Sequence, residues 1–294
     1  YNPFVFADDG DNVIYGIDGD DSIYALAGND IVFSGNGNNI VNSAQGDDII
    51  HAGSGNDKVF AGTGNDGIST GAGNDTVDAG SGDDVIDVGQ GSAFVEGGAG
   101  QDRLTLDLTE LPGQFAGQMN YSFGDGNGNF LGTYNWATSF EVLRSDLAGV
   151  GEFQIFGNGL VAHYRNIEAV NLTTGTREDL LIFQGGTQYD GGPGIDAFYA
   201  DFSSTAQALT WDADAGTFTP VDGVTVVNIE RFLVSSGSGN DVFRATEGGL
   251  SHHVETGAGT DIVELGAGND YVASGTGNDG ISTGAGNDTV DASS

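Results

Sequence analysis

The sequence of 294 residues contains no cysteine, which excludes a disulfide framework and a cysteine metal site. Basic residues are nearly absent: seven Lys and Arg, with Lys58 the only lysine, face 43 Asp and Glu, and the formal net charge is -36. Nucleic acids and anionic membranes are bound through cationic patches, so we expect neither as a partner. Multivalent cations are the partners that this charge attracts. No run of residues is apolar enough to span a bilayer, so we expect no membrane insertion.

Proline is scarce as well, with four residues, while glycine reaches 52. The glycines do not follow the three-residue period of collagen. An acidic composition is often typical of disorder, but 38% of the residues are hydrophobic and they recur at regular intervals. We therefore expect a folded chain that is stabilised by something other than disulfides.

From residue 7 to residue 105 the chain divides into consecutive nine-residue units, as in GSGNDKVFAGTGNDGIST at 53–70. The fourth position of every unit is glycine, and two residues later stands Asp, Asn or, once, Ala. Two residues further on, every unit carries a branched aliphatic residue. The aliphatic positions are Ile14, Ile23, Val32, Val41, Ile50, Val59, Ile68, Val77, Ile86, Val95 and Leu104.

The residue types within a unit indicate what the unit does. Glycine permits the positive φ of a tight turn whose carbonyl groups face one point, and Asp adds a carboxylate there. Carbonyl and carboxylate oxygens are the ligands that a hard cation such as Ca²⁺ prefers. The rest of the unit alternates like a strand, with the aliphatic residue inward. Since one unit cannot bury a single side chain alone, the units must stack.

The pattern resembles the Gly-Gly-x-Gly-x-Asp-x-aliphatic-x nonapeptide of RTX proteins, the hemolysin-type calcium-binding repeat proteins. The best matches are GGAGQDRLT at 97–105 and GGPGIDAFY at 191–199. The resemblance implies an all-β fold, a right-handed parallel β-roll or β-helix solenoid with two repeats per turn and several Ca²⁺ ions in the turns. It also implies type I secretion and an extracellular or cell-surface location. A solenoid of metal-free β-turns is the alternative, but it leaves the charge without counterions.

The resemblance places the metal ligands in two files, because alternate units line opposite edges of the roll. The predicted ligands of the first array are Asp21, Asp57 and Asp75 on one edge and Asp30, Asp48, Asp66, Asp84 and Asp102 on the other. Further predicted ligands are Asp196, from the unit at 191–199, and Asp241, Asp261, Asp270, Asp279 and Asp288, from a second array. Asn12, Asn39 and Ala93 depart from the pattern. We expect weaker ligation around the two asparagines and a site lost or borrowed at Ala93.

Composition predicts four segments. Residues 1–105 form an N-terminal RTX array and residues 237–294 a C-terminal one, in which 275–292 repeat 62–79 identically. Residues 106–190 lose the nine-residue period and form a wider irregular β-helical segment or an inserted β segment, with a separate β-sandwich as an alternative. Residues 191–236 form β-helical coils with long loops. No segment shows a sustained helical period.

Three irregularities accompany this division. YRNIEAVNLTTGTREDLLIF at 164–183 and VVNIERFLVSSGSGNDVF at 226–243 share Asn-Ile-Glu, then apolar residues, Gly and Asp, and each follows a Gly-Gly-x-Gly-x-Asp unit. The step from Asp241 to Asp261 is two residues too long, so we expect an enlarged coil around His252 and His253. The chain begins at Tyr1 without a visible signal peptide and ends at Ser294 inside an array. We therefore expect a processed chain or a segment of a longer one.

No catalytic constellation is visible, and we expect that the chain is not an enzyme. His51, His163, His252 and His253 do not form the His-Glu-x-x-His frame of metalloproteases. The Gly-x-Ser-x-Gly matches around Ser69 and Ser282 lack the strand, elbow and helix of serine hydrolases. A carboxylate pair at glycosidase spacing cannot be singled out among so many acidic residues.

These observations predict a non-catalytic extracellular structural protein whose folding Ca²⁺ drives, in a self-assembling bacterial surface layer (S-layer), filament or adhesin. An outward apolar stripe of Val13, Tyr15, Ile31, Phe33 and Ile49 suggests packing against the middle segment or against another chain. Two alternatives remain open. One is the calcium-binding repeat portion of a larger secreted lipase, protease or polysaccharide epimerase. The other is a carbohydrate-binding module that uses Trp136, Trp211 and the tyrosines of the middle segment.

Overall fold

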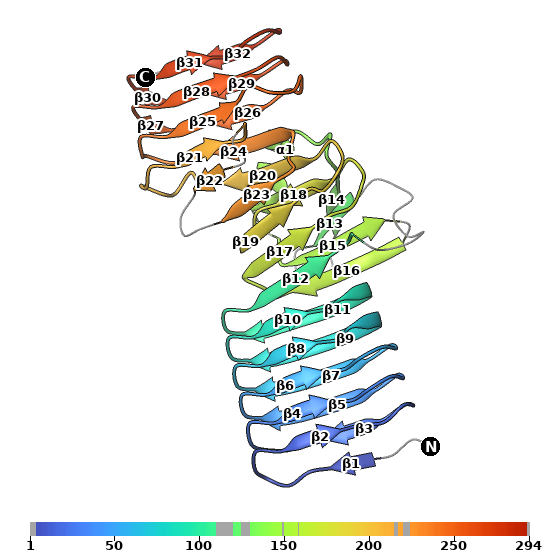
Figure 1. The fold of residues 1–294 in the computed structure, drawn as a ribbon. Helices are drawn as coiled ribbons and strands as arrows, with labels where there is room; N and C mark the ends of the chain where they lie inside the picture. Colours follow the sequence, from blue (N-terminus) through green and yellow to red (C-terminus); the bar gives the residue numbers. More distant parts are fainter. Residues whose placement is uncertain are drawn as a thin grey trace. The chain divides into compact units, whose positions relative to one another are not determined.

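The computed structural model describes residues 4–109, 120–124, 130–148, 150–157, 159–214, 217–219 and 224–292 (Figure 1). The chain forms two compact units, and each is described by itself. Unit 1 comprises Tyr1–Gly117, Tyr121–Thr133 and Gly149–Asn171, and unit 2 comprises Gln118–Asn120, Tyr134–Ala148 and Leu172–Ser294. The four segments were defined by repeats in the sequence, whereas the two units are defined by contacts in space. The division into four segments therefore stays a prediction.

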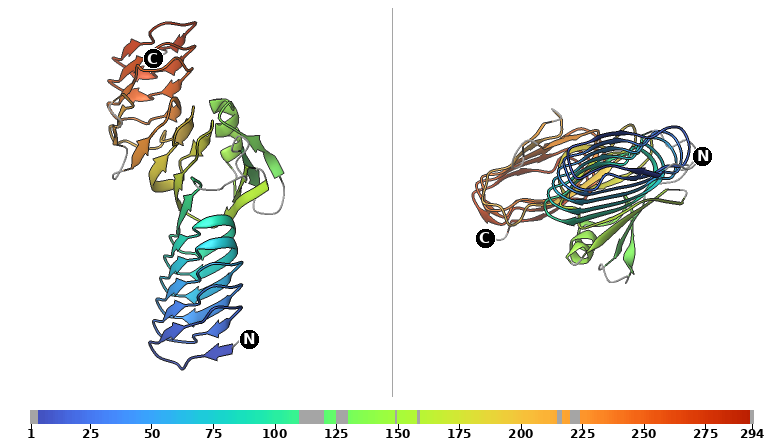
Figure 2. Two further views of the ribbon diagram at one scale, coloured as in Figure 1. Left: turned by 45° about the vertical axis from the view of Figure 1, so that its right-hand side comes forward. Right: turned by 90° about the horizontal axis from the view of Figure 1, so that it is seen from below.

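Unit 1 starts with two parallel sheets whose strands alternate along the chain. One sheet contains β1 (Phe4–Phe6), β3 (Ser22–Tyr24), β5 (Ile40–Gln45), β7 (Lys58–Thr63), β9 (Ala72–Ser81) and β11 (Gln90–Ala99). The other contains β2 (Val13–Tyr15), β4 (Ile31–Phe33), β6 (Ile49–His51), β8 (Gly67–Ser69), β10 (Val85–Asp87) and β12 (Arg103–Asp107). Each of these strands pairs with the one a full turn later, as Ile14 lies opposite Val32. One turn of this parallel β-solenoid is therefore two nine-residue units, and the turns overlie one another when viewed along the stack (Figure 2).

The core of the array is the file of aliphatic residues that the sequence predicts. Ile14 is 7% exposed and Ile68 is 3% exposed, while Val32, Ile50 and Ile86 are fully buried. Parallel pairing in register places identical positions of successive turns on top of one another, as Ile50 lies opposite Ile68. Each aliphatic side chain therefore buries itself against the copies above and below, which a single unit could not achieve.

The later strands of unit 1 enlarge both sheets. β16 (Gly159–Arg165) pairs in parallel with β11, and β17 (Ala169–Thr173) follows β12 in the second sheet. β15 (Glu152–Gly157) pairs antiparallel with β16, and β13 (Asn120–Gly124) and β14 (Phe130–Tyr134) continue that sheet beyond it. β16 and β17 thus add parallel strands to the solenoid, while β15 begins an extension of the first sheet with an antiparallel pairing.

Unit 2 is built on the same principle. One parallel sheet contains β18 (Leu180–Ile182), β20 (Ala197–Asp201), β24 (Arg231–Ser235), β26 (His253–Glu255), β29 (Tyr271–Ala273) and β32 (Thr289–Asp291). A second contains β22 (Thr217–Thr219), β21 (Thr210–Asp212), β25 (Val242–Ala245), β28 (Ile262–Leu265) and β31 (Gly280–Ser282), with β21 and β22 antiparallel. β19 (Gly185–Asp190) pairs with β23 (Thr225–Val227), and β27 (Ala258–Gly259) with β30 (Thr276–Gly277).

The turn predicted to be enlarged pairs Val242 with Ile262 and Leu233 with His253, twenty residues apart, before the spacing returns to eighteen at His253 and Tyr271. The extra length is accommodated near Gly248 and Gly249. A Cβ atom at either glycine would meet nothing within 4 Å, so the chain bulges into open space there. The strands on both sides keep their register, because the additional residues never enter the ladder.

One helix occurs in the described part of the chain, α1 at Phe140–Leu147, which the sequence did not predict. Only Phe140 and Leu143 are buried on it, too few to give a recognisable helical period. Tertiary contacts hold it in unit 2: the Phe140 ring stacks on His253 at 4.1 Å, and Arg144 pairs with Glu255 at 2.6 Å. Packing rather than sequence pattern therefore decides this helix.

Candidate metal centre

The turns between strands come into direct backbone contact. Gly46 has a φ of +128°, and a Cβ atom at this position would overlap the carbonyl oxygen of Gly28, one turn earlier. Only glycine combines this backbone conformation with so close an approach. The repeated glycines thus stack the turns tightly enough for the Asp side chains of successive turns to meet.

The Asp residues form files in which one carboxylate oxygen accepts a backbone hydrogen bond, and Asp21 differs from the others because its Oδ2 accepts the Ile17 N–H at 2.9 Å. In the others, Oδ1 accepts a hydrogen bond from the backbone N–H of the equivalent residue one turn earlier, as Asp66 does from Asp48 at 2.8 Å. The other donor and acceptor pairs of this kind in unit 1 are Asn12 to Asp30, Asp30 to Asp48, Asp66 to Asp84, Asp84 to Asp102, Asn39 to Asp57 and Asp57 to Asp75. In unit 2 they are Asp179 to Asp196, Leu209 to Asp241, Asp241 to Asp261, Asp261 to Asp279, His252 to Asp270 and Asp270 to Asp288.

The second oxygen of these carboxylates is buried and accepts no hydrogen bond. Such an oxygen is present in Asp21, Asp30, Asp48, Asp57, Asp66, Asp75, Asp84, Asp102, Asp196, Asp241, Asp261 and Asp270. A buried charged oxygen without a partner costs several kcal/mol, roughly, so a regular file of them calls for a cation. Asp279 and Asp288 are half-exposed, since they lie in the last described turns with no further turn over them.

The pKa values of these carboxyl groups indicate the same need. Burial, together with the negative charges of the neighbouring Asp84 and Asp48, raises the pKa of Asp66 to about 7, against the lowering effect of a backbone hydrogen bond. Burial also raises the pKa of Asp57 and Asp84 to about 6 and that of Asp196 to about 8. Burial thus disfavours the charged form of these carboxyl groups, and a bound cation would favour that form.

Carbonyl oxygens lie beside the carboxylates. A Cβ atom on Gly16 would overlap the carbonyl oxygen of Ser34 and come within 2.8 Å of Asp21 Oδ2, the oxygen that accepts the Ile17 N–H. Carboxylate and carbonyl oxygens therefore converge on one small space beside the turn, which glycine keeps open. An all-oxygen donor set in a flexible turn fits Ca²⁺. When bound, Ca²⁺ would neutralise the carboxylates and join two successive turns.

The positions that depart from the Asp pattern behave in different ways. Asn39 is fully buried, its Oδ1 accepts the N–H of Asp21 at 2.9 Å, and its Nδ2 lies 3.3 Å from the carbonyl oxygens of Gly35 and Ala52. An amide N–H₂ group thus contacts the carbonyls that a cation would otherwise contact. At Ala93 the carboxylate is absent, and β9 and β11 run through the turn as two continuous ten-residue strands with Ala93 opposite Asp75.

Three acidic residues in this network were missed in the sequence. Asp179 is 3% exposed and donates its N–H to Asp196 Oδ1 at 2.7 Å. Glu168 accepts the N–H of Asp102 at 2.9 Å and Glu230 that of Asp196 at 2.8 Å, so each takes the place of the next Asp. The signal was visible as the shared Asn-Ile-Glu and Gly-to-Asp pattern of 164–183 and 226–243, but nothing in the sequence alone shows that these segments enter the Asp files.

The residues considered for other sites have structural surroundings of their own. His252 occupies an Asp position in its file, where its Nδ1 accepts the Phe232 N–H at 3.3 Å, and burial lowers its pKa to about 4. Glu141, His253 and Glu255 place ligand atoms within 4.8 Å of one another, but Glu255 already pairs with Arg144. Ser69 and Ser282 end short strands of the solenoid, β8 and β31.

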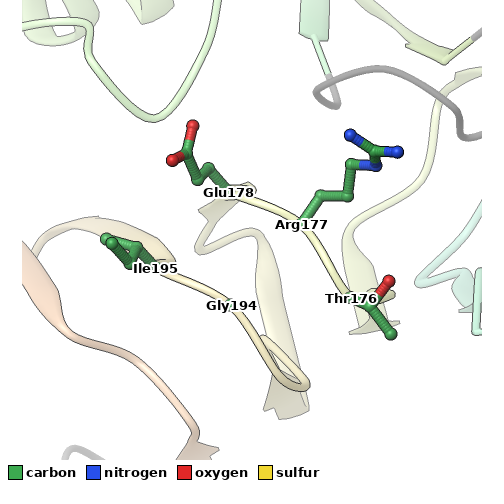
Figure 3. A pocket seen from close by; sticks show the side chains of 5 residues that line it. All are labelled: Thr176, Arg177, Glu178, Gly194 and Ile195. Carbon is green, nitrogen blue, oxygen red and sulfur yellow. The ribbon is translucent and has the colours of Figure 1, made fainter.

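A pocket of ≈ 470 Å³ lies beside the Asp179 turn and is lined by Thr176, Arg177, Glu178, Gly194 and Ile195 (Figure 3). Arg177 stands near the position where regular units have glycine, and a Cβ on Gly194 would overlap its carbonyl oxygen. The side chains of Arg177 and Glu178 extend from the same turn in different directions (Figure 3). Gly194 thus keeps the backbones of the two turns in contact here, as Gly192 does beside the carbonyl oxygen of Gly175.

The geometry defines a class: a parallel β-solenoid whose stacked turns carry files of buried carboxylates suited to calcium. The family model of the RTX calcium-binding nonapeptide repeat, which spans four copies of the repeat, matches residues 6–41, 33–68, 68–95, 79–107 and 255–292. The chain therefore carries RTX calcium-binding repeats, folded as a β-roll, as the resemblance of its repeats predicted. No curated protein matches the chain. Among the described residues, no helix has the length and apolar character needed to cross a membrane.

Proposed function

We propose that this chain is a non-catalytic, extracellular structural protein whose folding is driven by Ca²⁺ and which assembles on a bacterial surface as part of a layer, filament or adhesin. The observation that carries the proposal is the file of buried Asp oxygens without hydrogen-bond partners. With a net charge of -36, the compact state is opposed by repulsion until cations bind. Binding energy at sites that exist only in the folded chain is folding energy.

The proposed location follows from the calcium requirement. Ca²⁺ is scarce in the cytosol and plentiful outside the cell, so such a chain stays unfolded during export and folds on arrival. The RTX repeats support this route through their resemblance to secreted proteins. The absence of cysteine fits a protein that ions rather than disulfides hold together.

The surface of the N-terminal turns supports an assembling protein. Tyr15 is 70% exposed and stacks on Phe33 at 5.2 Å, and Phe33 stacks on His51 at 5.0 Å. On the other sheet, Phe6 is 67% exposed and stacks on Tyr24 at 4.9 Å. Stacked, exposed aromatic ladders of this kind favour contact with another molecule. The exposure of these rings in the described structure favours, of the two partners expected from the sequence, packing against another chain.

The alternative of a carbohydrate-binding module is weakened, because most of the aromatic residues expected to bind sugar are buried. Trp211 is 4% exposed and packs among Phe198, Phe232 and Phe243, so it is a core residue of unit 2. The tyrosines at 121, 134, 164 and 189 are buried as well. Trp136 is half-exposed. The repeat portion of a larger secreted enzyme stays the second candidate, with the same calcium chemistry.

The test is a Ca²⁺ titration of protein stripped with EDTA, followed by far-UV circular dichroism and by light scattering. We expect a cooperative gain of β-structure and growth into large particles, both reversed by chelator. A fold that forms equally well in EDTA would overturn calcium-driven folding. Compaction to a stable monomer would overturn the surface assembly and favour the repeat portion of a larger secreted enzyme.

A further inference from the structure

The Asp files end in two places at a glutamate from a segment without nonapeptide repeats. In unit 1, Glu168 Oε2 accepts the N–H of Asp102 at 2.9 Å, 66 residues away in sequence. In unit 2, Glu230 Oε2 accepts the N–H of Asp196 at 2.8 Å, 34 residues away. Within the regular array the same contact joins Asp residues 18 apart. Each glutamate thus joins the end of an inserted segment to the repeat unit that precedes that segment.

Both glutamates occupy the Asp position of the ladder. In the array, the residue after each Asp donates its N–H to the Asp carbonyl one turn earlier, as Ile49 does to Asp30 at 2.8 Å. Ala169, directly after Glu168, donates to the Asp102 carbonyl at 3.0 Å, and Arg231, directly after Glu230, donates to that of Asp196 at 2.9 Å. The register of the two segments is therefore that of the next repeat turn.

The local sequences are the same at both places. Asp102 and Asp196 end the units GGAGQD and GGPGID, and both glutamates end an Asn-Ile-Glu tripeptide. Asn166 and Asn228 adopt φ values of 51° and 55°, the left-handed conformation that asparagine tolerates. This conformation turns their carbonyl oxygens toward the units: a Cβ atom on Gly97 would overlap the oxygen of Asn166, and one on Gly191 that of Asn228.

The chemistry that converges there is anionic and oxygen-rich. Asp102 is 1% exposed and Asp196 is fully buried, and Oδ2 of each accepts no hydrogen bond. The hypothetical Cβ of Gly97 lies within 2.8 Å of Asp102 Oδ2 and that of Gly191 within 2.9 Å of Asp196 Oδ2, next to the Asn carbonyls. Within the described residues, neither Glu168 nor Glu230 forms an ion pair with Lys, Arg or His.

We propose that Asp102 with Glu168, and Asp196 with Glu230, each hold one further Ca²⁺ ion that closes the base of an insertion. The ligands that this chain supplies are the free Asp oxygen, the Glu carboxylate and the carbonyl of Asn166 or Asn228. This proposal rests on calcium binding by the repeats but adds ligands outside the nonapeptide. It also gives the insertions a mechanical anchor, because closing long loops costs entropy that a multivalent ion offsets.

Counting bound calcium tests the proposal. Glu168→Gln and Glu230→Gln keep an oxygen that accepts the Asp N–H and remove only the charge, so the fold is retained. In native mass spectrometry at saturating Ca²⁺, we expect each variant to bind one ion fewer than the wild-type chain and the double variant two fewer. Glu264→Gln is the matched control: Glu264 on β28 pairs with Arg244 on β25, and the loss of its charge should leave the count unchanged.

The outcomes separate this inference from the proposed function. A wild-type chain that binds no calcium overturns both. A wild-type chain that binds calcium, with unchanged counts in both Gln variants, overturns only the glutamate sites. Should a variant lose several ions through unfolding, crystals of the wild-type chain grown with Tb³⁺ decide: we expect an anomalous peak shared by Asp102 and Glu168 and another shared by Asp196 and Glu230. Peaks at the Asp files with none at these pairs would overturn the inference.

Discussion

Asp48 donates its backbone N–H to Oδ1 of Asp66 at 2.8 Å, eighteen residues later, and Oδ2 of Asp66 is left buried without a hydrogen-bond partner. The first oxygen therefore fixes the spacing of two turns, and the second carries a charge that nothing in the described chain satisfies. The two oxygens of one carboxylate thus have different roles, and this arrangement recurs through the files. It explains how one residue type serves both the ladder and the metal.

Asp66→Asn separates these two roles. The amide oxygen can still accept the Asp48 N–H, but the charge is lost, so we expect one Ca²⁺ fewer per chain. With calcium about 100-fold above the dissociation constant of the site, the loss lowers the free energy of unfolding by about 2.7 kcal/mol. Native mass spectrometry and denaturant unfolding measure both effects. Asp78→Asn, on the exposed side of β9, is the control with the same charge change, and equal effects of the two variants would contradict the assignment.

Asn39→Asp should have the opposite effect. The Nδ2 group of Asn39 contacts two carbonyl oxygens at 3.3 Å, and a carboxylate there would repel them unless a cation intervenes. We expect the variant to be less stable than wild type in EDTA and to bind one additional ion in saturating calcium. Asn56→Asp controls for the added charge, because other units carry Asp at this exposed position, as at Asp47. An unchanged ion count in Asn39→Asp would show that the amide does not occupy a cation position.

Phe33→Asp tests the exposed aromatic ladder. The substitution places a charge between the stacked Tyr15 and His51 rings, and it removes the centre of the stripe. If this surface joins chains, calcium-induced particle growth should be strongly reduced while circular dichroism is retained. Val85→Asp, an exposed position on β10 of the same sheet, should leave growth unchanged. Identical light scattering and melting of Phe33→Asp and wild type would contradict the hypothesis that this surface joins chains.

Acid should weaken the attachment of α1 in unit 2. Burial alone would raise the pKa of Glu255, but His253 and Arg144 outweigh it and lower the pKa from 4.5 to about 2. Because the folded pKa lies below the unfolded one, the contribution of this group is complete above pH 4.5 and is lost as the pH falls toward 2. Its size is on the order of 2 kcal/mol after screening by solvent.

Arg144→Met measures that contribution. The gap in unfolding free energy between wild type and variant, in saturating calcium, should be constant from pH 6.5 to pH 5 and narrow below about pH 4.5. Arg103→Met, an exposed arginine on β12, should show no such gap at any pH. A gap for Arg144→Met that is equally large at pH 3.5 would contradict the role of the Glu255 charge.

The sequence by itself determined the solenoid. Three features recur every nine residues: a glycine at the fourth position, an acidic residue two positions later and a branched aliphatic residue two positions after that. Two units form one turn, so each position lies next to the equivalent position eighteen residues later. Ile50, Ile68 and Ile86 are buried as this period requires, because contacts between neighbours in a repeat array are set by a fixed separation along the chain. The same argument predicted calcium as the cation class, from the oxygen-rich turns.

Only the tertiary structure decided the features that depend on long separations. Whether Glu168 meets Asp102 depends on the path of 66 residues, and no period encodes that path. Trp211 is a core residue because Phe198, Phe232 and Phe243, from three other strands, surround it. Helix α1 exists because Phe140 and Arg144 find partners on β20 and β26. In a repeat array the fixed spacing determines which residues lie one turn apart. The position of an insertion depends instead on the contacts that its side chains make with distant parts of the chain.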